Sequence, residues 1–197
     1  MNESAAPEPG PASDAEDEPL RDLAAIEGDS GELMDARLLA AVHLAGHAVA
    51  SEACGREYPR LRLEPSFGVP GVGTGCPLRV DAGAEARGGG PARNGLEGAI
   101  ITSLAGVAAE RLAGGAAEGA CVDVTRWLTD GDPREAEPYI EWLRLKAERT
   151  VEHPLRQRVI LAVARALLTR GALEPREIEV LATEETGRYM RGHGAGS

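Results

Sequence analysis

Two segments of this chain repeat apolar residues at steps of three and four, and this periodicity constrains the fold more than any other feature. The first segment runs from residue 35 to 55, with apolar residues at Leu38, Leu39, Val42, Ala45, Val49 and Ala53. The second runs from residue 96 to 114, with an apolar face of Ile100, Leu104, Val107, Ala108 and Leu112. Residues at these steps share one face of an α-helix, so both segments predict helices that pack through an apolar face.

The rest of the chain predicts further helices and a small β element. Leu61 and Leu63 alternate with charged residues between two prolines, which is typical of a short, half-exposed strand. Residues 68–95 are rich in Gly and Pro and predict a loop region with one further short strand near 78–80. We expect helices from about residue 123 and at about 135–151, 155–170 and 174–187. The predicted fold class is therefore mainly α with a small β element.

The acidic residues are concentrated at the N-terminus. Residues 1–35 carry eleven acidic side chains and one basic one, a net charge of −10, which leaves −1 for the rest of the chain. We interpret residues 1–33 as a disordered acidic tail, 34–190 as one folded domain and 191–197 as a flexible C-terminus. The near-neutral domain has no basic stripe, and aromatic residues make up 3% of the chain, so nucleic-acid binding is not expected.

The sequence also lacks the segments that direct a protein into or across a membrane. It has no apolar run of about 18 residues, and its N-terminus is not basic and then apolar. Its three cysteines, Cys54, Cys76 and Cys121, are odd in number and widely spaced, unlike a disulfide framework. We therefore expect a cytoplasmic protein that does not bind membranes.

His43 and His47 are the first candidates for chemistry. They lie four residues apart on the first predicted helix, so their Cβ atoms should be about 5–6 Å apart on one face. Two imidazoles on adjacent turns can bind one zinc ion, as in the H-E-x-x-H pattern. The alternative is a pair of helix histidines with ordinary hydrogen bonds and no metal.

Three segments, in order, resemble parts of the FtsH-type zinc metalloprotease family. Residues 41–51 (AVHLAGHAVAS) are similar to its zinc helix, HEAGHAV, and residues 101–112 (ITSLAGVAAERL) are similar to its LAGRAAEEL helix. Residues 119–125 (GACVDVT) resemble its GAxxDL segment, and residues 167–175 resemble the end of small stand-alone relatives. The resemblance covers about residues 35–185 and implies an FtsH-type peptidase-like helical domain.

The resemblance implies a set of site residues. His43, His47 and Asp123 match the family's zinc ligands, and two imidazoles with one carboxylate leave an open fourth position for water. Glu110 matches the acidic residue of the second segment and is implied as an outer partner that orients a ligand histidine. The alternatives are that Asp123 caps a helix and that Glu110 faces solvent.

The chain departs from the family at Leu44, where the family has the glutamate that acts as general base. A leucine can neither accept nor donate a proton, and such a group typically supplies about 10²–10⁴-fold in rate. Zn²⁺ binding can therefore survive while peptide hydrolysis is largely lost. Glu52 lies about 140° around the helix from His47 and faces elsewhere. Glu110 is the better candidate for a substitute base, because the resemblance implies that its helix packs near the metal.

Four functions are compatible with these residues. The first is a zinc-binding, protease-derived domain, a poor or inactive peptidase, that binds a peptide, a small molecule or a partner in the zinc pocket; a homo-oligomer or a complex with another protein is compatible with it. The second is a zinc-dependent enzyme with lyase- or hydrolase-type chemistry, and the third is a residual peptidase with Glu110 as base. The fourth is a helical scaffold without metal. The G-x-x-x-x-G-K-[ST] motif of the ATPase that drives FtsH-type proteases does not occur in this sequence.

Overall fold

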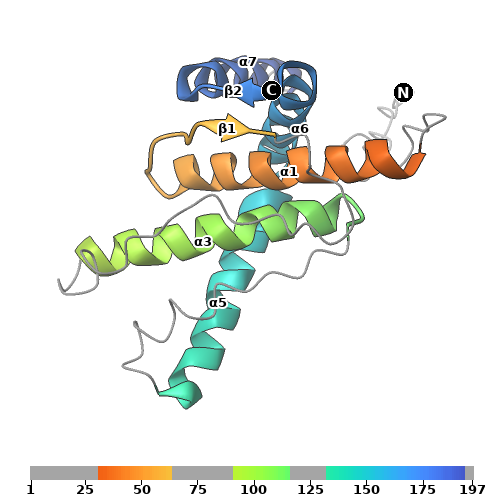
Figure 1. Cartoon of the computed structure of the whole chain (residues 1–197). Helices are drawn as coiled ribbons and strands as arrows, with labels where there is room; N and C mark the ends of the chain where they lie inside the picture. The colour runs from red at the N-terminus through yellow and green to blue at the C-terminus, as the bar shows by residue number, and fades with distance from the viewer. Residues whose placement is uncertain (1–30, 64–90, 116–131, 194–197) are drawn as a thin grey trace, which may run out of the picture.

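The computed structural model describes residues 31–63, 91–115 and 132–193, and it is mainly helical there (Figure 1). The elements are α1 (Gly31–Ala53), β1 (Leu61–Arg62), α3 (Pro91–Leu112), α5 (Pro133–Glu152), α6 (Pro154–Arg170), β2 (Ala172–Leu173) and α7 (Pro175–His193). This confirms the prediction of a mainly α chain with a small β element. The helix predicted from about residue 123, the strand near 78–80 and nearly all of the predicted tail lie outside the described residues.

The other predicted helices are present, and their ends follow local chemistry. Both α1 and α3 begin four or five residues earlier than the apolar periodicity indicated, and α7 continues to His193, six residues beyond the predicted end. Asp132 caps α5 by accepting a hydrogen bond from the Arg134 backbone N–H. Gly171 ends α6 with a φ of 76°, a left-handed conformation that glycine adopts without steric cost.

The small sheet joins two distant parts of the chain. Strand β1 pairs with β2 in antiparallel orientation, with Leu61 opposite Leu173 and Arg62 opposite Ala172. Both leucines are fully buried, so the pair closes the core beside α6. The pattern around Leu61 predicted the first strand correctly. The second strand was not predicted, because two residues between helices are too few to show an alternation.

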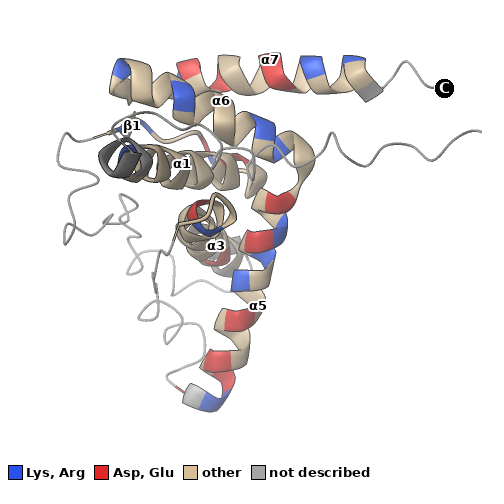
Figure 2. Cartoon of the chain, turned by 90° about the vertical axis from the view of Figure 1, so that its right-hand side faces the viewer, with Lys and Arg blue, Asp and Glu red and all other residues tan. Residues whose placement is uncertain are grey.

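Helix α1 lies at the centre of the packed helices. It runs alongside α3, while α5 and α6 follow one another steeply across both, and α7 packs on α6 (Figure 1). Every residue from 40 to 51 is buried, so this part of α1 is covered on all sides, not on one face only. Figure 2 shows charged residues along the outer helices α5 and α7, whereas this stretch of α1 has none. None of the described helices is both long and apolar enough to cross a lipid bilayer.

Candidate metal centre

The two histidines lie in the buried part of α1. His43 is 3% exposed and His47 is fully buried. Their ring centroids are 4.7 Å apart, and the ring planes are nearly perpendicular, at 86°. The helix therefore places both imidazoles side by side, as their spacing predicted.

His47 is bound to the backbone of α3. Its Nδ1 donates a hydrogen bond to the carbonyl oxygen of Thr102, at 2.7 Å. A carbonyl can only accept, so Nδ1 carries the ring proton and Nε2 of the neutral ring keeps its lone pair. Nε2 is buried and has no hydrogen-bond partner among the described residues. A buried acceptor without a partner is costly in a folded protein, and a lone pair of this kind is what a metal ion binds.

The surroundings of His47 keep its ring neutral at physiological pH. Burial is the main cause that lowers the pKa of His47 from 6.5 to about 4, and the neighbouring His43 acts in the same direction. The hydrogen bond to the Thr102 carbonyl opposes this change without cancelling it. His47 is therefore in the deprotonated form that metal binding requires.

His43 is oriented by a side chain of α3. Its Nδ1 donates a hydrogen bond to Oε2 of Glu110 at 2.8 Å, and the carboxylate side chain is only 13% exposed. Glu110 is therefore a partner of a candidate ligand and not a solvent-facing carboxylate. In metal-binding histidines, the ring nitrogen that does not bind the metal commonly donates a hydrogen bond to a carboxylate, which fixes the orientation of the ring.

Close approach of α1 and α3 makes both contacts possible, and glycines allow that approach. A Cβ at Gly46 would lie 2.7 Å from both the Ala105 carbonyl oxygen and the Ala109 Cβ. At the end of α3, a Cβ at Gly115 would lie 2.7 Å from Cγ of Glu110, so Gly115 leaves room for that side chain. Thr102 and these glycines were not predicted as site residues. For Gly46, a glycine inside a helical pattern was the available signal.

The remaining predicted site residues have different outcomes. Leu44 is 3% exposed and belongs to the hydrophobic core. Glu52 is exposed, as expected for a residue that faces away from His47. Asp123, the third predicted ligand, lies outside the described residues. Within 31–63, 91–115 and 132–193, no three His, Cys, Asp or Glu side chains form a group that could hold a metal, so the described part supplies two of the predicted ligands.

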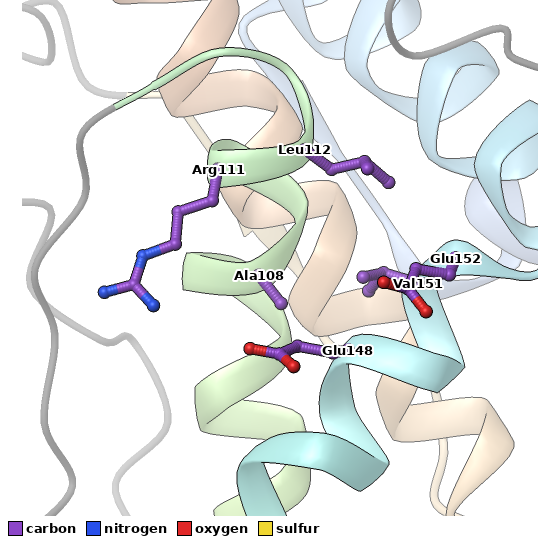
Figure 3. A pocket seen from close by; sticks show the side chains of 6 residues that line it. All are labelled: Ala108, Arg111, Leu112, Glu148, Val151 and Glu152. Carbon is purple, nitrogen blue, oxygen red and sulfur yellow. The ribbon is translucent and has the colours of Figure 1, made fainter.

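A cavity of about 230 Å³ lies elsewhere, between the C-terminal turns of α3 and α5 (Figure 3). Its lining residues are Ala108, Arg111, Leu112, Glu148, Val151 and Glu152. Neither histidine nor Glu110 is among them, so this cavity between α3 and α5 is separate from the histidine pair on α1.

We expect the metal-free protein to lose stability as the pH falls from about 6.5 to about 4. The unfolded chain takes up a proton at His47 near pH 6.5, but the folded protein does so only near pH 4. The contribution of His47 to the free energy of unfolding is therefore complete above pH 6.5. It is lost as the pH falls from 6.5 to 4, by at most about 3 kcal/mol. Urea unfolding at a series of pH values measures it.

The variant His47→Asn is the control for this prediction. Its amide can still donate to the Thr102 carbonyl, but it does not titrate. The free energy of unfolding should therefore depend less steeply on pH in the variant than in the wild type between pH 6.5 and 4. Equal dependence in both proteins would contradict the assignment of this window to His47.

Comparisons with known proteins did not assign the chain to a family. A scan against protein-family models and searches of the curated proteins and of the solved structures gave no match.

Proposed function

We propose that this chain is a zinc-binding domain of the FtsH-type metalloprotease kind, with little or no peptidase activity, whose metal pocket binds a peptide or a small molecule. The observation that carries the proposal is the buried Nε2 atom of His47, which has no partner among the described residues. The ordered resemblance of three segments to the family supports it from the sequence.

The donor set fits a zinc ion. His43 and His47 each use Nδ1 in a hydrogen bond to α3, which leaves Nε2 as the second nitrogen of each ring. Asp123 is proposed as the third ligand from the family resemblance. Two imidazoles and a carboxylate are a known zinc donor set with one open position. When bound, zinc supplies a Lewis acid and lowers the pKa of a coordinated water.

The residues around this donor set explain why we propose weak or absent hydrolysis. Leu44 follows His43 directly, at the position where the family has its glutamate, and it offers no group that transfers a proton. Glu110 is the nearest substitute, but its Oε2 accepts the hydrogen bond from Nδ1 of His43. That contact favours a positioning role for Glu110 over the role of general base.

Metal analysis of protein purified without a histidine tag tests the proposal. We expect about one Zn²⁺ per chain, as for a single site of two imidazoles and a carboxylate. Added Zn²⁺ should raise the melting temperature, because a ligand that binds only the folded state stabilises it. The control is the double variant with His43→Asn and His47→Asn, which should bind no zinc and show no rise. Wild-type protein that binds no zinc would instead support the scaffold without metal.

A further inference from the structure

Gly106 faces the ring of His47 across the contact between α1 and α3. A Cβ at this position would lie 2.5 Å from Cε1, 2.6 Å from Nε2 and 2.9 Å from Nδ1 of His47. Real Cβ atoms essentially never come closer than 3.0 Å to such atoms, so no other amino acid fits here while the ring keeps its position.

The same ring makes its hydrogen bond one helical turn earlier. The Thr102 carbonyl, which accepts from Nδ1, lies four residues before Gly106, so the two positions are adjacent along α3. The imidazole therefore lies against the bare backbone of this turn. Its Nδ1 faces the carbonyl, and the face of the ring covers the space that a side chain at position 106 would fill.

We propose that Gly106 is a positioning residue for His47. It keeps the ring on the Thr102 carbonyl, which sets the tautomer and the direction of the Nε2 lone pair. The consequence for zinc rests on the proposed function, but the contact between ring and backbone does not. An alanine at position 106 must push the ring aside, break the bond to Thr102 and turn Nε2 away from its present direction.

The test combines Gly106→Ala with a matched change on the same helix, Gly98→Ala. The Cβ of Gly98→Ala meets only the Cys54 side chain, at 3.2 Å from its Cβ, and both changes raise helix propensity alike. We expect Gly106→Ala to weaken zinc binding by about 10–100-fold, the range for loss of a partner that orients a ligand. Gly98→Ala should bind zinc within about twofold of the wild type. Equal zinc affinity in all three proteins would overturn the proposal.

Two metal-free measurements separate this proposal from the proposed function. In wild-type protein, the buried Nδ1 proton of His47 should give a slowly exchanging NMR signal, and Gly106→Ala should remove it. The fall in melting temperature caused by Gly106→Ala should also be smaller in a His47→Ala background, where no ring opposes the new methyl group. If Gly106→Ala does not fold alone, folding of the double variant supports the contact, and failure of both variants to fold overturns it.

Discussion

Replacing Leu44 by glutamate should convert the zinc-loaded protein into a measurable peptidase. The change restores a proton acceptor on α1 next to His43, where the resembling family has its general base. General acid–base catalysis typically contributes about 10²–10⁴-fold, and we expect a gain of that order over the wild type. Cleavage of unfolded casein, measured at neutral pH with zinc present, reports the gain.

The variant Leu44→Gln is the control, because its side chain has nearly the same shape as glutamate but cannot take up the proton. Leu44 is 3% exposed, so both polar substitutions cost stability, and rates should be compared at a temperature where both variants are folded. Equal cleavage by the two variants would exclude glutamate as the general base. A folded, zinc-loaded Leu44→Glu protein without activity would show that more than the base is missing.

Replacing Asp123 by asparagine should weaken zinc binding by more than about 100-fold, beyond the range for loss of an outer partner. The substitution keeps the size of the side chain but removes the negative charge that we assign to the third ligand. Competition titration with a chelating dye measures the affinity. Because Asp123 is 76 residues after His47, a large effect would place this distant segment at the histidine pair.

Glu110→Gln provides the matched comparison within the same site. The Gln oxygen can still accept from Nδ1 of His43, but it no longer carries the negative charge of the carboxylate. We expect a loss of about 10–100-fold, smaller than that of Asp123→Asn. If Asp123→Asn binds zinc like the wild type, its role as a ligand is wrong and capping a helix is the remaining interpretation.

Much of the fold follows from local patterns that can be read in the sequence. The apolar periodicity predicted α1 and α3, and the helices expected at about 155–170 and 174–187 agree with the boundary between α6 and α7. The pairing of Leu61 with Leu173 was not predicted, because β2 is only two residues long and forms where the chain meets β1. The complete burial of residues 40–51 was also missed, since apolar periodicity indicates one face and does not count the helices that cover it.

In the candidate site, too, one part of the arrangement follows from the sequence and another part only from the packing of the helices. The spacing of His43 and His47 by itself determined that their rings share a helix face, because helix geometry is local. Only the tertiary structure decided what each ring contacts, since Glu110 is 67 residues from His43 and Thr102 is 55 residues from His47. Thr102 acts through a backbone carbonyl that every residue has, and Gly106 acts by having no side chain. Neither contact can be predicted from the local sequence, because both form only where α1 and α3 pack together.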